Sequence, residues 1–255
     1  MVWKVVLLGM PKVSVNILTK NRVDSLARAL VSVECQSFKD WEVVIVNDGS
    51  SDDTSHYLEN QKFKLENQHS VQIINHQTSV GITLSRQEAL RKSSGEYIAI
   101  LDDDDEWMDE NKLKKQVEFL NSRTDYVLVG GGIKIEKNEI KFRPETDRQI
   151  RNWMLFKNPF FTSSVMFRRD AALKAGGFIK DDIDLGEDYD LWLRLLQQGK
   201  GYNFNQIFTS YRQAQYSREK RKIFLQKQLN LIKKYASSYP FYPLALAILK
   251  LRIML

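Results

Sequence analysis

Four consecutive aspartates, Asp102 to Asp105, are the residues of this chain whose spacing points most directly to chemistry. Four negative charges so close together repel one another unless water or a cation screens them. Mg²⁺ and Mn²⁺ prefer oxygen ligands and commonly bind one or two carboxylates together with substrate phosphates. One interpretation is therefore a metal–diphosphate site. The alternative is a solvated acidic turn before a helix that begins near Asp109, because acidic residues are favourable at helix N-termini.

The first half of the chain predicts a repeated order of strand, polar turn and helix. The strands are expected at residues 12–18, 42–46, 71–75 and 97–101. Asp24 is expected to cap the N-terminus of the first helix, and Gly95 to end the third. This alternation predicts a parallel sheet whose polar turns meet at one edge, which is where open α/β sheets bind ligands.

The second half of the chain is less regular. The elements expected there are a helix at 111–120, a strand with three glycines at 126–136, an apolar strand within 158–169, a short helix at 171–178 and a helix within 181–199. Glu187 and Asp188 stand in the first turn of the last helix, where the helix dipole favours negative charge.

The composition limits the class of protein. The 255 residues, 43% hydrophobic and 27% charged, fit one large α/β domain or a domain with a tail. Cys35 is the single cysteine, so no intramolecular disulfide can form. Neither GxGxxG nor GxxxxGK[ST] occurs, which leaves dinucleotide-binding and P-loop chemistry unsupported. No stretch reaches the roughly 18 to 20 apolar residues that span a bilayer, and the first nine residues are too short for a signal peptide.

Positive charge is concentrated at the C-terminus. The net charge is +6, but residues 212–255 carry +9 and residues 1–211 carry −3. The positive charge therefore gives information only about what the tail binds. The rest of the chain is mildly acidic, and no nucleic-acid ligand is expected for it.

Six motifs, taken in order, resemble the family 2 glycosyltransferases. They are VSVNILTKNR (13–22), EVVIVNDGSSDDT (42–54), VGITLSRQEAL (80–90), GEYIAILDDDDEW (95–107), GGF (176–178) and GEDYDLWLRL (186–195). The resemblance implies the GT-A fold, a single nucleotide-diphospho-sugar transferase domain with a mixed, mainly parallel central sheet flanked by helices. It divides the chain into an N-terminal appendage (1–10), the GT-A domain (11–212) and a C-terminal helical tail (213–255).

The resemblance also implies an activity and a cofactor. Family members move a sugar from a nucleotide-sugar, here expected to be a UDP-sugar, to an acceptor hydroxyl with inversion, using Mn²⁺ or Mg²⁺. The expected setting is surface polysaccharide, lipopolysaccharide or capsule biosynthesis. The QxxRW motif of processive members is absent, because Glu219 follows the QxxR at residues 215–218, so a non-processive hexosyltransferase-type enzyme is expected.

The motifs assign roles by resemblance, residue by residue. The nucleotide pocket would contain Thr19 and Asn21, with Asp48 on the base, Arg86 near the diphosphate and Asp103 on the ribose. Asp104, last of the DXD triplet, would bind the metal, and Asp188 would be the general base. Asp102 and Glu187 would support these two residues. The chemistry agrees, because a metal and an arginine can stabilise the departing diphosphate while a carboxylate accepts the proton of the hydroxyl.

Each assignment has a plainer alternative. Asp188 or Glu187 could cap a helix, Asp48 could be an ordinary turn acid, and Arg86 could lie on a solvated helix face. Asp105 and Glu106 are expected to be structural. The three histidines, His56, His69 and His76, show no metal-ligand spacing and are expected at the surface.

Two rival activities were weighed against the sequence. A sugar-nucleotide pyrophosphorylase would need a glycine-rich basic loop after the first strand, and TKNR (19–22) has no glycine. A catalytically inactive nucleotide-sugar-binding assembly subunit is argued against by the presence of both the acidic triplet and Asp188.

The tail at residues 218–255 permits two interpretations. A basic amphipathic helix followed by an apolar segment suits an anionic membrane surface, where lipid-linked glycan acceptors reside. The enzyme would then be cytoplasmic and peripheral at the inner face of the cytoplasmic membrane. Alternatively, the helix packs on the domain or across a homodimer with its lysines in water.

Overall fold

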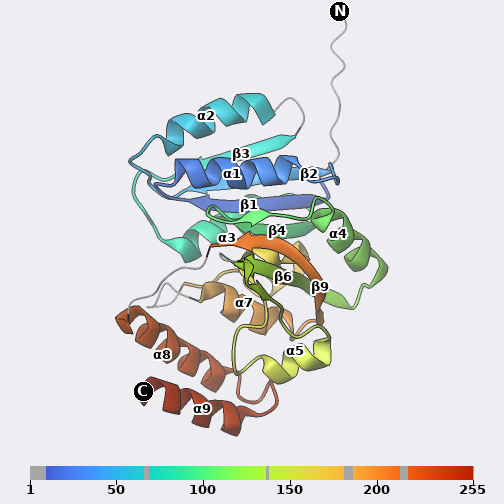
Figure 1. The fold of residues 1–255 in the computed structure, drawn as a ribbon, viewed down its shortest axis with the longest axis vertical. Coiled ribbons are helices and arrows are strands. Elements are labelled where there is room, and N and C mark those ends of the chain that lie inside the picture. Colours follow the sequence, from blue (N-terminus) through green and yellow to red (C-terminus); the bar gives the residue numbers. More distant parts are fainter. Residues whose placement is uncertain (1–9, 66–68, 136–137, 181–185, 213–217, 255) are drawn as a thin grey trace, which may run out of the picture.

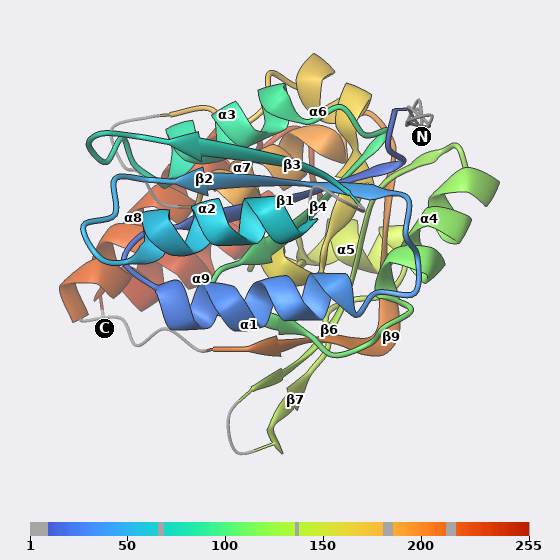
Figure 2. The same ribbon diagram turned by 90° about the horizontal axis from the view of Figure 1, so that it is seen from above.

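The computed structural model describes residues 10–65, 69–135, 138–180, 186–212 and 218–254. Helices cover both faces of a mixed nine-stranded sheet (Figures 1 and 2). The strands are β1 (Val13–Thr19), β2 (Trp41–Asn47), β3 (Ser70–Asn75), β4 (Tyr97–Asp102), β5 (Glu106–Trp107), β6 (Tyr126–Ile135), β7 (Ile140–Lys141), β8 (Met166–Arg168) and β9 (Lys200–Tyr211). The helices are α1 (Val23–Glu34), α2 (Thr54–Leu65), α3 (Ile82–Lys92), α4 (Lys112–Ser122), α5 (Asp147–Trp153), the 3₁₀ turn η2 (Thr162–Ser164), α6 (Arg169–Lys174), α7 (Glu187–Leu195), α8 (Arg218–Lys234) and α9 (Tyr242–Met254).

The strand order is β3-β2-β1-β4-β8-β6-β9-β5, with β7 paired to β6. The first four strands are parallel, whereas β8 runs antiparallel to both β4 and β6. The predicted mixed sheet flanked by helices is therefore confirmed. In Figure 2, α1 and α2 lie on one face of the parallel strands and α3 lies on the other.

Residues of β4 are buried alternately on the two faces of the sheet. Tyr97, Ala99 and Leu101 pack in the core beneath α1 and α4, and Ile98 and Ile100 pack in the core shared with α7. This two-sided burial explains the unbroken apolar run before the aspartates, because parallel strands covered on both faces have no solvent side.

Two predicted caps are wrong. Arg22 is the N-cap of α1, and Asp24 lies within the first helical turn. Helix α3 ends at Lys92 with Ser93 as its C-cap, so Gly95 does not end it. Gly95 instead permits close packing of β4 against β1, because a Cβ atom there would lie 2.6 Å from the backbone nitrogen of Ser14.

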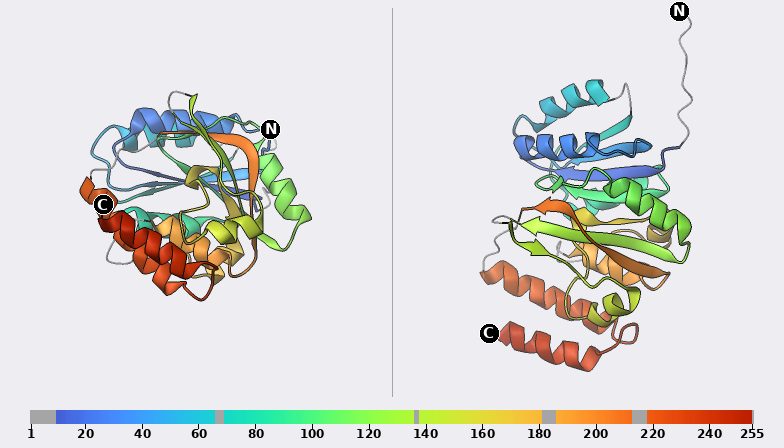
Figure 3. Two further views of the ribbon diagram at one scale, coloured as in Figure 1. Left: turned by 60° about the horizontal axis from the view of Figure 1, so that its bottom comes forward. Right: turned by 45° about the vertical axis from the view of Figure 1, so that its right-hand side comes forward.

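The tail helices α8 and α9 pack on the domain. Figures 1 and 3 show them side by side at the end of the molecule opposite α2. Ile232 and Leu249 are buried in the same core as Trp192 of α7. The hydroxyl of Tyr235 also donates a hydrogen bond of 3.0 Å to Asp190.

In the described part of the chain, every helix is too short or too polar to cross a bilayer.

The three glycines of β6 allow β9 to pair closely beside it. A Cβ atom at Gly131 would lie 2.3 Å from the ring of Phe208, which is fully buried. A Cβ atom at Gly132 would lie 2.4 Å from the ring of Phe142, which is 46% exposed and so has room to move. The glycines are therefore not equivalent: Gly131 faces a side chain that is fixed by its surroundings.

We predict that Gly131→Ala lowers the free energy of unfolding by about 1–3 kcal/mol, because overpacking forces buried neighbours out of position. Gly132→Ala is the matched control and should cost less, since Phe142 can rotate into solvent. Urea unfolding followed by circular dichroism measures both. Equal losses in the two variants would contradict the packing described here.

Candidate active site

The predicted nucleotide-pocket residues and the aspartate cluster share one edge of the sheet. Thr19 ends β1 beside Asn47 of β2, and Leu18 is paired with Asp102 at the end of β4. The carbonyl of Thr19 accepts a hydrogen bond of 2.9 Å from the amide of Asp48. The carboxyl ends of β1, β2 and β4 therefore meet, as the sequence predicts.

The four aspartates are divided among different partners. Asp102 faces Arg86, Asp103 and Asp104 both face Arg22, and Asp105 faces η2. Asp103 and Asp105 are buried, which contradicts the alternative of a solvated turn. Helix α4 begins farther on, with Asn111 as its N-cap.

Arg22 supplies the first positive charge at the cluster. Its Nη1 donates to Asp103 Oδ1 at 2.8 Å and to Asp104 Oδ2 at 2.9 Å. Burial nevertheless raises the pKa of both carboxyls above the ordinary value, against the attraction of Arg22. Burial and the charge of Asp102 raise the pKa of Asp105 to about 8. Burial thus disfavours the charged form of these carboxyls, and Arg22 offsets this only in part for Asp103 and Asp104.

Asp105 serves as an anchor for distant segments. It accepts hydrogen bonds from the hydroxyl of Ser163 and, at 2.8 Å, from the backbone amide of Arg212. Glu106 accepts from Arg28 at 3.1 Å on the surface. Both acids therefore have protein partners, in agreement with the structural roles expected for them.

Arg86 joins the aspartate cluster to the start of α7. Its Nη2 donates to Asp102 Oδ1 at 2.8 Å and its Nε donates to Glu187 Oε1 at 2.9 Å. The side chain is 4% exposed, so the alternative of a solvated helix face is wrong. Burial alone would lower the pKa of the guanidinium, but the charges of Asp102 and Glu187 outweigh it and raise the pKa. This ion bridge crosses from β4 to α7 through α3.

Asp188 lies at the N-terminus of α7, where positive dipole charge favours a carboxylate. Its Oδ2 accepts from Asn158 Nδ2 at 3.1 Å and from Thr162 Oγ1 at 2.6 Å, and its Oδ1 accepts from the amide of Tyr189 at 2.6 Å. The N-cap of α7 is Gly186, with φ of 75°, which has no side chain to cap the helix. The bond to the Tyr189 amide agrees with the helix-cap alternative for Asp188, whereas the bonds to Asn158 and Thr162 go beyond it. Glu187 pairs instead with Arg86.

The turn η2 connects the two acidic groups a second time. Thr162 donates to Asp188, and the hydroxyl of the next residue, Ser163, donates to Asp105. The same hydroxyl accepts a hydrogen bond of 3.1 Å from the backbone amide of Asp102. Ser163 is fully buried, and its carbonyl accepts from the indole of Trp107 at 2.8 Å. The aspartate cluster and Asp188 therefore flank one short, firmly held segment.

Asn21 and Asp48 hold the neighbouring loops. Asn21 adopts a positive φ of 54°, and its side-chain oxygen accepts from the amide of Ser51 at 2.7 Å. Asp48 accepts from Ser79, Val80 and Gly81 at 2.6–3.1 Å, besides His76. These contacts order the loop before α3, and the role of Asp48 toward a base stays a prediction.

His76 is not the surface residue that the sequence suggested. Its side chain is 13% exposed, with Nδ1 2.8 Å from Asp48 and Nε2 2.9 Å from Glu88. Burial acts to lower its pKa, but the hydrogen bonds to the two carboxylates outweigh burial and raise the pKa above 6.5. His76 therefore bridges Asp48, directly after β2, and Glu88 of α3, and its raised pKa favours the charged form.

A polar cavity of about 430 Å³ adjoins the cluster, with Asp104, Arg28, Lys134 and Arg212 among its lining residues. Asp104 is 25% exposed there and is accessible to a ligand. Within the described ranges, no three Asp, Glu, His or Cys side chains converge on one point as metal ligands. The donor set thus fits an ion that takes one carboxylate from the protein and the rest of its ligands from phosphate and water.

Sequence reasoning missed several residues that build this site: Arg22, His76, Asn158, Thr162 and Ser163. Arg22 stood inside the TKNR motif and could have been noticed as a cation near four acids. Asn158, Thr162 and Ser163 carry no local signal, because their partners lie 26–58 positions away in the chain.

The profile of the family described as "Glycosyl transferase family 2" matches residues 14–177. The "Putative glycosyltransferase EpsE" of Bacillus subtilis (strain 168) is 29% identical over 80% of this chain and 73% of its own length. The "Putative teichuronic acid biosynthesis glycosyltransferase TuaG" of the same organism is 30% identical over 79% of each chain. The Escherichia coli "UDP-Glc:alpha-D-GlcNAc-diphosphoundecaprenol beta-1,3-glucosyltransferase WfgD" is 28% identical over 80% of this chain and 78% of its own.

Solved structures share the fold. The S. aureus TarS 1-349 fragment superposes with a TM-score of 0.68 at 19% identity, and it has also been solved with UDP-GlcNAc. The match covers 87% of this chain but 65% of that fragment, less than two thirds of its length. Mannosyltransferase PcManGT from Pyrobaculum calidifontis, solved with GDP-Man and Mn²⁺, superposes with a TM-score of 0.67 at 18% identity, over 95% of this chain and 74% of its own. These likenesses confirm the GT-A-like fold.

We predict that the protonated His76 makes stability depend on pH. Because its pKa is raised in the folded state, its contribution is complete below the unfolded value of about 6.5 and is lost as pH rises through the folded pKa. His76→Gln should remove this loss, seen as a flatter dependence of the free energy of unfolding as pH rises above about 6.5. His56→Gln, at an exposed position, is the matched control. Identical pH profiles for wild type and His76→Gln would show that the bridge is not charged.

Proposed function

The chain belongs to glycosyl transferase family 2, and from that premise we propose that it transfers a sugar from a UDP-sugar to a hydroxyl of a lipid-linked glycan acceptor. The product would serve surface polysaccharide synthesis. The name of TuaG, with teichuronic acid biosynthesis, supports a polysaccharide, and the name of WfgD, with UDP-Glc and a diphosphoundecaprenol acceptor, supports the donor and the lipid.

One observation carries the proposal: Thr162 and Ser163, adjacent in η2, bind Asp188 and the aspartate cluster respectively. An inverting transfer needs the proton acceptor and the diphosphate-binding groups on opposite sides of the sugar. Two acidic groups held by neighbouring residues of one rigid turn meet the requirement of a shared site.

In the proposed reaction, Asp188 takes the proton of the acceptor hydroxyl. The acceptor oxygen forms a bond to the anomeric carbon while the bond from that carbon to the diphosphate breaks, and UDP leaves with the bonding electrons. Asn158, Thr162 and the amide of Tyr189 fix the direction of the Asp188 carboxylate. Oδ2 accepts two of these hydrogen bonds, whereas Oδ1 accepts one and keeps a second lone pair with which to meet the hydroxyl.

We propose that Asp104 holds Mn²⁺ or Mg²⁺, which would supply positive charge against the departing diphosphate. The exposure of Asp104 supports this role, and a cation would favour the charged form of a carboxyl whose pKa burial raises. Arg22 and Arg86 add fixed positive charge beside it. Asp102 and Glu187 support the site through Arg86.

The remaining assignments also stay proposals. Thr19, Asn21, Asp48 and Asp103 would form the nucleotide pocket at the carboxyl edge of the sheet. Residues 11–212 would be the catalytic domain and 213–255 the tail, with residues 218–255 contacting the inner face of the cytoplasmic membrane. The QxxR at residues 215–218 and the appendage at 1–10 fall largely outside the described residues.

We predict that Asp188→Asn lowers kcat by about 10²- to 10⁴-fold, the usual contribution of a general base, while UDP still binds. The amide keeps hydrogen-bonding atoms but accepts no proton. Asp170→Asn, which removes an acid that is 86% exposed, is the matched control and should be fully active. UDP release from a panel of UDP-sugars, with Mn²⁺ and a polyprenyl-diphosphate-linked sugar, measures the rate.

Two results would count against the proposal. Transfer by Asp188→Asn at the wild-type rate would remove Asp188 as the base. Binding of UDP without transfer to any acceptor of this class, in the wild type, would favour the alternative of an inactive nucleotide-sugar-binding subunit.

A further inference from the structure

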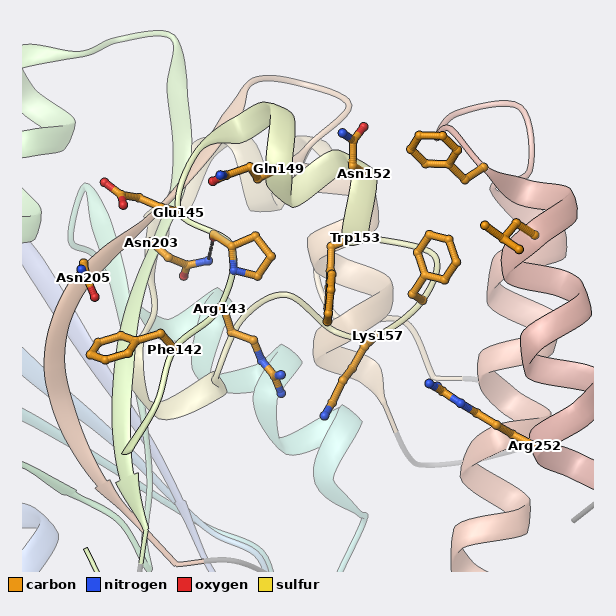
Figure 4. Close-up of a pocket in the computed structure, with 14 residues that line it drawn as sticks. Phe142, Arg143, Glu145, Gln149, Asn152, Trp153, Lys157, Asn203, Asn205 and Arg252 are labelled. Atoms are coloured by element: carbon orange, nitrogen blue, oxygen red, sulfur yellow. Dashed lines mark hydrogen bonds between the residues drawn. The ribbon is translucent and has the colours of Figure 1, made fainter. Parts of the chain in front are cut away.

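A cavity of about 840 Å³ lies between the segment that follows β7, helix α5, β9 and the tail helix α9 (Figure 4). None of the nucleotide-pocket or metal residues named above lines it. The cavity is nevertheless connected to the candidate base, Asp188. Its lining residue Lys157 directly precedes Asn158, and Asn158 donates a hydrogen bond to Asp188. Arg143, also in the lining, lies 4.2 Å over the ring of Phe161, which precedes Thr162.

Three cations point into this cavity without an acidic partner. Figure 4 shows the side chains of Arg143, Lys157 and Arg252 converging on a common space. None of the three forms an ion pair with any residue that the structure describes. The Nε of Arg143 is buried and has no hydrogen-bond partner there. Burial lowers the pKa of Lys157, and the charges of Arg143, Lys141 and Arg252 lower it further.

One acid shares the lining but is already engaged. Glu145 accepts a hydrogen bond of 2.8 Å from the hydroxyl of Tyr202, outside the cation group. Lys141, near the cavity, is paired with Glu139 at 3.2 Å. Positive charge in the cavity is therefore in excess, and clustered cations with unused donors indicate an anionic ligand.

Part of the lining is apolar and exposed, beside the amide side chains of Gln149, Asn152, Asn203 and Asn205. Trp153 is 43% exposed, Phe241 is 52% exposed and Leu244 is 55% exposed, and Phe142 and Phe156 complete this part of the cavity. Exposed aromatic and aliphatic side chains grouped in a concave site mark a surface that binds an apolar group. The cavity thus presents an apolar wall next to a cation cluster.

We propose that this cavity binds the lipid diphosphate of the acceptor, with the cations on the diphosphate and the apolar wall on the first isoprene units. The assignment rests on the proposed function. Arginine side chains match phosphate oxygens with paired donors, and the volume lies in the range of small-ligand sites, roughly 300–1,000 Å³. Lys157 directly precedes Asn158, which binds the carboxylate of Asp188. A diphosphate beside Lys157 would therefore bring the attached sugar near the carboxylate that would deprotonate it.

The test uses farnesyl diphosphate as the probe, titrated by calorimetry into the full-length protein without any nucleotide. We expect Arg143→Gln combined with Lys157→Gln to weaken binding by about tenfold or more, because each lost charged hydrogen bond is worth at least that factor. The matched control, Arg91→Gln with Lys92→Gln, removes two exposed cations from α3 and should bind as the wild type does. Thermal unfolding should show both double variants folded, since the cavity cations lose no ion pair.

Further probes separate the sources of binding. Trp153→Ala should weaken the binding of farnesyl diphosphate but not that of inorganic pyrophosphate, because the substitution removes only part of the apolar wall. Farnesyl diphosphate binding that is unchanged by the Arg143 and Lys157 substitutions would overturn the proposal. The proposal would also be overturned if pyrophosphate bound to the protein as tightly as farnesyl diphosphate does. Binding of phosphatidylglycerol vesicles without binding of farnesyl diphosphate would overturn it as well.

The donor is tested separately. UDP titrated with Mn²⁺ should bind equally to wild type and to the Arg143 and Lys157 double variant. Failure of UDP to bind either protein would contradict the proposed function, whereas the farnesyl diphosphate result would still decide whether the cavity is a lipid-diphosphate site.

Discussion

The guanidinium of Arg86 is the contact on which the geometry of the site depends. It is almost completely buried and lies between two carboxylates, Asp102 at the end of β4 and Glu187 at the start of α7. A buried charge that loses its partner costs several kcal/mol, so the three groups stabilise one another only while all are in place. The bridge therefore fixes α7, and with it Asp188, relative to the aspartate cluster. The turn η2 reinforces the same arrangement from the other side through Thr162 and Ser163.

Charge is distributed unevenly around this bridge. On the sheet edge, acids outnumber the cations that face them, and burial raises the pKa values of Asp103, Asp104 and Asp105. In the cavity beside α9, Arg143 and Lys157 lack acidic partners in the described chain. On one side several acids share two arginines, and on the other the cations have no acidic partner in the described chain. This arrangement suits the proposed reaction, in which one side receives a metal-bound nucleotide and the other an anionic acceptor.

Much of the parallel half was predictable, because its strands are apolar on both faces and each ends in a polar turn. The acid cluster and Asp188 were recognisable because each lies within a short sequence motif that can be read without knowing the fold. Strand β9 was missed because its buried positions include the polar residues Asn203 and Thr209, whose side chains donate to distant backbone carbonyls. The contacts of Thr162, Ser163 and His76 were not predictable, since they depend on how separate loops meet after folding.

A double-mutant cycle between Arg86→Gln and Glu187→Gln, measured as the free energy of unfolding, tests the bridge most directly. Both side chains are buried and 2.9 Å apart, so the account predicts a coupling energy of about 1–3 kcal/mol, with the double variant less destabilised than the sum of the single ones. Additive losses, within about 0.5 kcal/mol, would show that the two side chains do not hold the site together.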